Sequence, residues 1–235
     1  MTTVRLYRST VDGRVTTGSR EGLHSVASVV SVNVGAVRTV EWHGRAVRTG
    51  IWKAPVDGRV AVRGVNLVGD DQADRRLHGG PDKAVYVYAV EDYEWWSKEL
   101  DRELGPGTFG ENLTVAGVDL GHLVIGSRWI VGTTELEVAQ PRQPCFKLGI
   151  RMGDAGFVER FDDAARYGAY LRIVREGDVG AGDPITFLPR DEGITLAELG
   201  AVRRGSDAEF LERIAADPAV PEAWRDWAGR QLARQ

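Results

Sequence analysis

Short β-branched segments separated by glycine-rich turns recur along this chain, and they constrain its fold more than any other feature. The first begins at Val26 and reads VASVVSVNVG, a pattern typical of a buried strand. A hairpin is predicted around His43-Gly44, which lies between two short alternating segments. Further strands are predicted at residues 58–67, 83–90, 122–132, 134–140, 169–174 and 184–189.

Only two helices are expected among these strands, over residues 90–104 and 157–167. About eight short strands with no alternating βαβ pattern favour a closed or nearly closed β-barrel over a doubly wound sheet. The predicted fold class is therefore mainly β, with a β-barrel domain at residues 26–190. Residues 1–25 are rich in Arg, Ser and Thr without a continuous apolar stretch, so we expect a poorly ordered N-terminal extension there.

The pattern changes after residue 190 and predicts a small C-terminal unit of three helices at residues 191–235. Two of these helices are expected to begin at capping boxes, in which a hydroxyl and a glutamate three residues later satisfy each other's backbone N–H groups. The two boxes are Thr195 with Glu198 and Ser206 with Glu209. The third helix begins near Pro221 and places Trp224 and Trp227 roughly on one face. So short a unit has only a marginal core, so we expect it to pack against the barrel or against a partner.

The overall composition excludes several classes of protein. The net charge is -4, so the chain has no overall basic character for nucleic acid, and no apolar run approaches the roughly 18 residues of a membrane span. The single cysteine can form neither an intramolecular disulfide nor a cysteine-rich metal site. We therefore expect a cytoplasmic protein that binds neither a membrane nor a nucleic acid polymer. Its oligomeric state stays open, a homodimer included.

That single cysteine, Cys145, lies in the stretch QPRQPCFKL, directly after Pro144 and four residues after Pro141. A cysteine outside a disulfide often behaves as a small buried hydrophobe. The neighbouring Arg142 and Lys147 favour instead the thiolate, which attacks electrophiles and binds metals. These neighbours leave two alternatives, an inert core residue or a reactive thiol.

The stretch RLHGGPDKAVYVY, residues 76–88, is a second candidate site. Gly79 and Gly80 permit a sharp turn whose backbone N–H groups can form an anion-binding nest. His78 and Lys83 flank this turn with a titratable donor and a cation. The same letters also describe an ordinary turn before a strand, so both interpretations stay open.

Two further loops carry polar groups. Glu111 and Asn112, in PGTFGENLT, could orient a ligand or could belong to a solvated loop. The stretch GDDQAD, residues 69–74, groups three aspartates as a cation site might, but it lacks the spacing of an EF-hand loop.

The chain has no GxGxxG after a strand, no GxxxxGK[ST], no GxSxG and no HExxH, so nucleotide hydrolysis, Rossmann-type redox chemistry and serine hydrolysis lose their usual markers.

Four motifs occur in a specific order: KAPVDGRVAVRGVNLVGDDQAD, HGGPDKAVYVY, FGENLT and QPRQPCFKL. This series resembles the MOSC domain family, and within it the bacterial YiiM-type proteins of the 6-hydroxylaminopurine resistance group. The resemblance runs from about Val26 to the C terminus and includes the three-helix tail. It implies a MOSC-type β-barrel that binds a molybdenum cofactor, molybdopterin, and it implies the reduction of N-hydroxylated bases or amidoximes.

The resemblance also implies roles for particular residues. Cys145 becomes the thiolate ligand of molybdenum, a soft donor for a metal already held by the dithiolene of the pterin. Residues implied to hold the pterin and its phosphate are Lys53, His78, Gly79, Gly80, Lys83 and Arg142. Glu111 and Asn112 are then expected to face the cofactor or the substrate.

Partners follow from what the chain lacks. It has neither an iron-sulfur cysteine set nor a flavin or nicotinamide motif, so electrons are expected from a separate reductase, a flavin or iron-sulfur protein. The three-helix tail is a candidate docking face for that partner. Three alternatives remain: a sulfur or molybdenum-cofactor carrier that uses the same cysteine, a non-catalytic barrel with an interaction tail, and a pyridoxal phosphate protein with Lys83 as the Schiff-base lysine.

Overall fold

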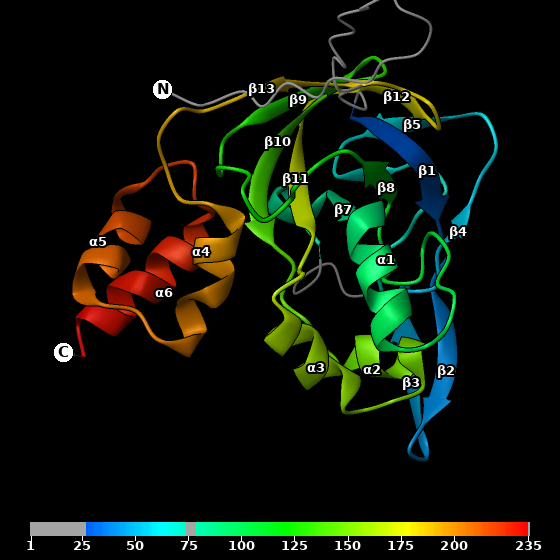
Figure 1. Ribbon diagram of the computed structural model, residues 1–235, viewed down its shortest axis with the longest axis horizontal. Coiled ribbons are helices and arrows are strands. Elements are labelled where there is room, and N and C mark those ends of the chain that lie inside the picture. The colour runs from blue at the N-terminus through cyan, green and yellow to red at the C-terminus, as the bar shows by residue number, and fades with distance from the viewer. Residues whose placement is uncertain (1–26, 74–78, 235) are drawn as a thin grey trace, which may run out of the picture.

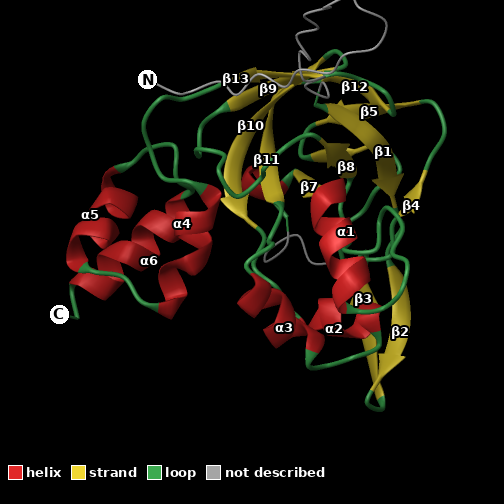
Figure 2. Ribbon diagram, in the orientation of Figure 1, coloured by secondary structure: helices red, strands yellow, loops and turns green. Residues whose placement is uncertain are grey.

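The structure, a computed structural model, describes residues 27–73 and 79–234. Short strands dominate this part of the chain (Figures 1 and 2). The strands are β1 (Ser28–Val34), β2 (Arg38–Trp42), β3 (Arg45–Thr49), β4 (Ala54–Pro55), β5 (Arg59–Arg63), β6 (Asn66–Leu67), β7 (Val85–Ala89), β8 (Leu113–Ala116), β9 (Arg128–Val131), β10 (Thr134–Pro141), β11 (Ala169–Arg175), β12 (Gly177–Gly180) and β13 (Ile185–Leu188). The helices are η1 (Pro81–Lys83), α1 (Val90–Glu99), α2 (Phe146–Met152), α3 (Phe157–Ala164), α4 (Leu196–Ala201), η2 (Val202–Arg204), α5 (Ala208–Ala216) and α6 (Glu222–Leu232).

The largest sheet has eight strands in the order β13-β9-β10-β11-β7-β8-β1-β4. Its neighbouring strands are antiparallel except for β7 and β8. Between β13 and β1, the described residues make one isolated bridge, Ser28 with Pro184, with a few backbone hydrogen bonds beside it. The mainly β class is therefore confirmed, whereas this sheet does not show the closed barrel that the strand pattern favoured.

One βαβ unit, β7-α1-β8, interrupts the antiparallel arrangement. The sequence pattern did not predict it, because β8 is only four residues long and follows a glycine-rich turn. The hairpin of β2 and β3 is confirmed, and both turn residues, His43 and Gly44, have positive φ as a two-residue hairpin turn requires.

Two hydrophobic cores stabilise the fold. The first contains valine, leucine and isoleucine side chains of the large sheet together with apolar residues of α4, α5 and α6. The second is mainly aromatic and lies where α1, α2 and α3 pack near β7, with Tyr88, Trp96, Phe109 and Phe161 among its buried members. The second core fixes α2, the helix that begins directly after Cys145.

Three α-helices fall within residues 191–235, and Figure 2 shows them on one side of the sheet, away from the β2-β3 hairpin. The capping box of Thr195 and Glu198 is confirmed. The second predicted box is wrong, because Asp207 rather than Ser206 caps α5 and accepts a hydrogen bond from the backbone N–H of Phe210. An aspartate side chain caps a helix as well as serine does, so either residue suited the position. The helices share the first core with the sheet, and their separation as a domain stays a prediction.

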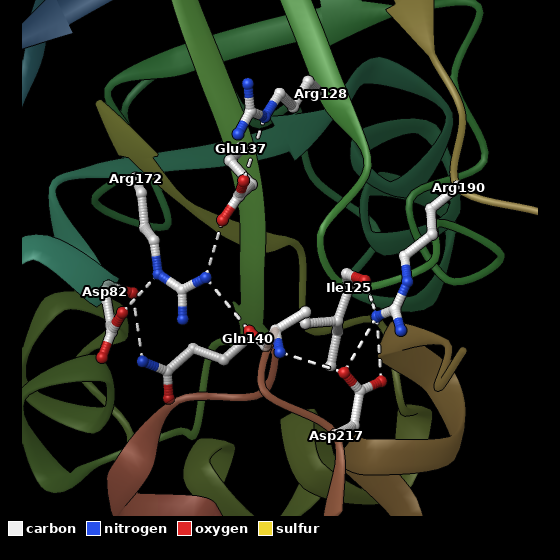
Figure 3. A network of polar contacts seen from close by, with 9 residues as sticks. Asp82, Ile125, Arg128, Glu137, Gln140, Arg172, Arg190 and Asp217 are labelled. Carbon is white, nitrogen blue, oxygen red and sulfur yellow. Dashed lines mark hydrogen bonds and ion pairs between the residues drawn. The ribbon is translucent and has the colours of Figure 1, made fainter. Parts of the chain in front are cut away.

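A polar network joins these helices to the sheet and to η1 (Figure 3). Arg172 of β11 forms ion pairs with Asp82 of η1 and with Glu137 of β10, and it donates a hydrogen bond of 3.0 Å to the carbonyl of Ala219. Arg190 completes the connection through an ion pair with Asp217 and a hydrogen bond of 3.1 Å to the Ile125 carbonyl. The segment between α5 and α6 is thus held against the same strands that carry the candidate site.

Within the part of the chain that the structure describes, none of the helices combines the length and the apolar character needed to cross a bilayer. The expected N-terminal extension at residues 1–25 lies outside the described residues, as do Asp74 and His78.

Candidate functional site

Cys145 lies at the junction between the end of β10 and the start of α2. Its backbone is extended, with φ -139° and ψ 166°, and its carbonyl accepts a hydrogen bond of 2.8 Å from the N–H of Leu148 in the first turn of α2. Its side chain is partly exposed. The two prolines before it restrict the connecting loop, so strand, loop and helix together fix where the thiol lies.

The thiol lines a pocket that we call the inner pocket. Its charged lining consists, among the described residues, of the cations Lys53, Lys83, Arg142 and Lys147 and the single carboxylate Asp71. Cations near a cysteine favour its thiolate form, and a cationic pocket favours anionic ligands. Cys145 and Lys83 therefore share a pocket whose charge suits both a thiolate and an anion.

Arg142 is the most unusual of these cations because it is buried, with 5% of its surface exposed. Its guanidinium lies 5.4 Å from the ring centres of both Tyr86 and Phe161, and its Nη1 has no hydrogen-bond partner. Burial by itself lowers the pKa of Arg142, but Tyr86, Tyr170 and Cys145 raise it overall, so the side chain stays charged. No described carboxylate pairs with it. A buried cation of this kind is costly unless an anion or acceptor completes its hydrogen bonds.

A second hydrogen-bond donor, next to Arg142 in the sequence, also lacks an acceptor. The side-chain Nε2 of Gln143 is buried without a hydrogen-bond partner, and Gln143 lines the same pocket. Two unpartnered donors on adjacent residues point to an acceptor-rich ligand, because buried donors are nearly always paired in complete structures.

Lys83 follows a turn that requires glycine. Gly80 has φ 92°, in the left-handed region, and its carbonyl accepts a hydrogen bond of 3.1 Å from the N–H of Lys83. Burial lowers the pKa of Lys83, while Asp82 and Cys145 partly offset that effect. Gly79 and Gly80 do not themselves line the inner pocket, and His78 lies outside the described residues. The turn thus presents Lys83 to the pocket.

Lys53 and Asn112 line the inner pocket, but both are held by Asp70. Lys53 forms a buried ion pair with Asp70, whose carboxylate also accepts hydrogen bonds of 2.9 Å from the backbone N–H of Gly35 and from Nδ2 of Asn112. Burial lowers the pKa of Lys53, and the interaction with Asp70 opposes this effect. The sequence does not reveal Asp70 as the partner of this lysine, although it shows the acidic stretch GDDQAD in which Asp70 lies.

Glu111 is fully buried and lies outside the lining of the inner pocket. Its Oε1 accepts hydrogen bonds of 2.6 Å from the hydroxyl of Tyr93, 2.6 Å from the N–H of Gly107 and 2.8 Å from the hydroxyl of Thr114. Its Oε2 has no partner, and burial raises the pKa of the carboxyl group. The structure thus places Glu111 inside the turn that leads to β8, where it braces the backbone.

A second pocket, which we call the outer pocket, adjoins the first. The two pockets share Lys83, Gln143, Cys145 and Tyr170. The remaining walls of the outer pocket include side chains of η2 and α6, namely Arg203, Trp224, Trp227 and Arg230. The sequence does not reveal these residues as site residues, because the spacing of the two tryptophans indicates only an apolar helix face. The outer pocket has a volume of about 440 Å³ and the inner pocket about 90 Å³.

Comparison with known proteins identifies the family of this chain. A family model described as MOSC domain matches residues 74–186, a span that contains Lys83, Arg142 and Cys145. Protein YflK of Bacillus subtilis is 38% identical over 201 residues, which cover 84% of this chain and 91% of that protein. This chain belongs to the MOSC domain family.

Within the family it is a YiiM-type protein. The crystal structure of YiiM from Geobacillus stearothermophilus superimposes with a TM-score of 0.73 at 28% identity, and the match covers 88% of this chain and 99% of that one. A protein of Gibberella moniliformis named Reductase is 32% identical over 151 residues, which cover 63% of this MOSC protein and 27% of the fungal one.

Proposed function

We propose that this MOSC protein binds a molybdenum cofactor through Cys145 and reduces N-hydroxylated compounds of the hydroxylaminopurine or amidoxime type. One observation carries the proposal: a buried, charged Arg142 with an unpartnered Nη1 lies in the same pocket as the cysteine. Membership of the MOSC family and the similarity to a protein named Reductase support it.

The residues present fit such a cofactor in their chemistry. The molybdenum cofactor offers an anionic phosphate and a metal that accepts a thiolate. The inner pocket offers two unpartnered donors, on Arg142 and Gln143, beside the thiol of Cys145. With the side chains of Lys83 and Lys147 where they are, its volume of about 90 Å³ suits the phosphate end alone.

The cofactor, when bound, supplies the two-electron redox chemistry. The balanced reaction takes one N-hydroxylated molecule, two electrons and two protons to the corresponding amine or amidine and water. Electrons come from a separate reductase, a flavin or iron-sulfur protein. Arg142 and Gln143 bind the acidic part of the cofactor and exclude water from it.

Lys83 is suited to donate a proton to the hydroxyl group of the substrate. Its burial lowers the pKa of its ammonium group, so Nζ can release a proton more readily than an exposed lysine can. It lines both pockets with Cys145, so a substrate bound next to the thiol would also lie beside Lys83. Lys83 is then the proton donor for the departing hydroxyl.

Metal analysis tests the proposal. Protein made in a host that synthesises the cofactor is expected to carry about one molybdenum per chain through its thiolate ligand. The Cys145→Ser variant loses the metal while keeping its circular dichroism spectrum. Wild-type protein then turns over an N-hydroxylated purine with a chemical reductant, and the variant does not. Wild-type protein without molybdenum under these conditions overturns the proposal.

A carrier of sulfur or of the cofactor is the second candidate, favoured by the partial exposure of Cys145 where the two pockets meet. Such a carrier holds a persulfide on Cys145. Mass spectrometry of the intact protein then shows the mass of one additional sulfur atom, and a mild reductant removes it. A persulfide that a cofactor-synthesis protein accepts, with no turnover of N-hydroxylated purine, selects this candidate over the reductase.

A further inference from the structure

The outer pocket joins the C-terminal helices to the candidate reaction site. Its shared residues Lys83 and Cys145 lie at one end, and side chains of η2 and α6 form the opposite wall. At about 440 Å³ its volume lies in the range of ordinary small-molecule sites, which hold a base-sized ring with its substituents. A compound in this pocket can therefore touch the helices and Cys145 at once.

The opposite wall combines two indoles with two guanidinium groups. Trp224 and Trp227 pack edge to face with ring centres 5.9 Å apart, and the guanidinium of Arg203 lies 5.4 Å from the ring centre of Trp224. Arg230 is exposed, and neither arginine forms an ion pair with a described residue. No described carboxylate lines the pocket. Aromatic rings bind the faces of bases, and arginine binds phosphate, so the pair fits a nucleotide.

The two pockets differ in exposure, and the difference suits a permanently bound cofactor in the inner pocket and a substrate in the outer pocket. The unpartnered donors of the inner pocket are buried, as suits a group that stays bound. The arginines of the outer pocket are exposed to solvent, as suits a compound that arrives and leaves with each turnover. Trp224 is buried, with 6% of its surface exposed, and its indole N–H is bonded to Gln140, whereas Trp227 is partly exposed. Trp227 is therefore the ring available for stacking.

We propose that the outer pocket is the substrate subsite and that it selects N-hydroxylated bases in their nucleotide form. The base stacks on Trp227, the phosphate contacts Arg203 and Arg230, and the N-hydroxyl group points to Cys145 and Lys83. This inference rests on the proposed reductase function and adds to it the substrate form and three specificity-determining residues on the C-terminal helices.

Calorimetry on cofactor-free protein tests the subsite without the reaction. The probes are adenosine 5′-monophosphate, adenosine and inorganic phosphate. Adenosine 5′-monophosphate is expected to bind more tightly than adenosine, and inorganic phosphate reports on the inner pocket, which Arg203 and Arg230 do not line. Trp227→Leu, which keeps an apolar side chain, weakens the binding of both nucleotide and nucleoside by about tenfold, the size expected for one stacked base. The double variant Arg203→Ala/Arg230→Ala lowers nucleotide affinity to that of adenosine and leaves adenosine unchanged.

Matched controls come from the β2-β3 hairpin, which lies on the other side of the molecule in Figure 1. Trp42→Leu and Arg45→Ala remove the same side-chain types there and leave all three affinities unchanged. Equal nucleotide affinity in wild type and Trp227→Leu overturns the inference. Loss of molybdenum from Trp227→Leu overturns it as well, because the pterin would then occupy the outer pocket. If the wild-type protein binds the nucleotide but no molybdenum, the proposed function is contradicted and the nucleotide subsite is still supported.

Discussion

The indole N–H of Trp224 donates a hydrogen bond of 2.8 Å to the side-chain oxygen of Gln140, across 84 residues of sequence. The side-chain nitrogen of Gln140 in turn donates one of 3.0 Å to the carbonyl of Asp82 (Figure 3). Two consecutive bonds thus connect α6, the end of β10 and the turn that carries Lys83. The C-terminal helices therefore line the outer pocket and also help to hold the turn that carries Lys83 in place.

Replacing Trp224 by phenylalanine is expected to destabilise the protein by about 1–3 kcal/mol, because the buried oxygen of Gln140 loses its donor and the smaller phenyl ring fills less of the buried site. Denaturant unfolding measures this change. The matched control is Trp227→Phe, on the same helix, whose indole makes no hydrogen bond with a described residue. Equal losses in the two variants would show that ring packing, and not the hydrogen bond, accounts for the effect.

Lys53→Met is expected to cost about 3–5 kcal/mol of unfolding free energy, because it leaves the carboxylate of Asp70 buried without its cation. The double variant Lys53→Met/Asp70→Asn removes both charges and recovers part of the loss. Lys98→Met on the exposed face of α1 is the control and changes stability little. A double variant as unstable as the single one contradicts the ion-pair explanation.

Glu111 makes stability depend on pH with a definite sign. Burial raises the pKa of its carboxyl group above the ordinary glutamate value of 4.5, so the folded state binds more protons than the unfolded state between the two pKa values. The stability from this group is fully present below pH 4.5 and falls as the pH rises through the folded pKa. Each unit of difference is worth about 1.4 kcal/mol.

Glu111→Gln removes this titration and keeps an acceptor for Tyr93 and Gly107. Unfolding free energies measured in steps from pH 4 to pH 9 are expected to fall more steeply for wild type than for the variant. Glu94→Gln on α1, whose side chain is exposed, serves as the control and follows wild type. Parallel curves for wild type and Glu111→Gln contradict a raised pKa.

The sequence predicted the strands best where apolar residues recur over a longer segment, as with the four valines of β1 and with Leu136 and Val138 of β10. It failed at β8 and α2, because four and seven residues are too few for a period to emerge and because packing on the aromatic core decides them. Helix α1 ends at Glu99, five residues before the predicted end, since Asp101 adopts a left-handed conformation that breaks the helix.

The candidate site also contains some features that the sequence predicts and others that depend on tertiary packing. Motif order placed Cys145, Lys83 and Arg142 together, and the structure brings these three into one pocket. The burial of Arg142 and the ion pair of Lys53 with Asp70 could not be read from the chain, because both depend on which strands become neighbours. Trp227 and Arg230 were missed for a related reason. An amphipathic pattern shows that a helix has an apolar face but not what lies opposite.

Arg142 should control the reactivity of Cys145 as well as ligand binding. Its charge and that of Lys83 interact with the cysteine, and a neighbouring cation favours the thiolate that alkylating reagents attack. In cofactor-free Arg142→Met, the pH profile of iodoacetamide alkylation is expected to move to higher pH by about one unit or more, as for the removal of a close opposite charge. Arg142→Lys keeps the charge and stays near the wild-type profile. Arg160→Met, on the exposed side of α3, leaves the profile unchanged. A wild-type profile in Arg142→Met would mean that the guanidinium does not act on the thiol, and its unpartnered Nη1 would then need another explanation.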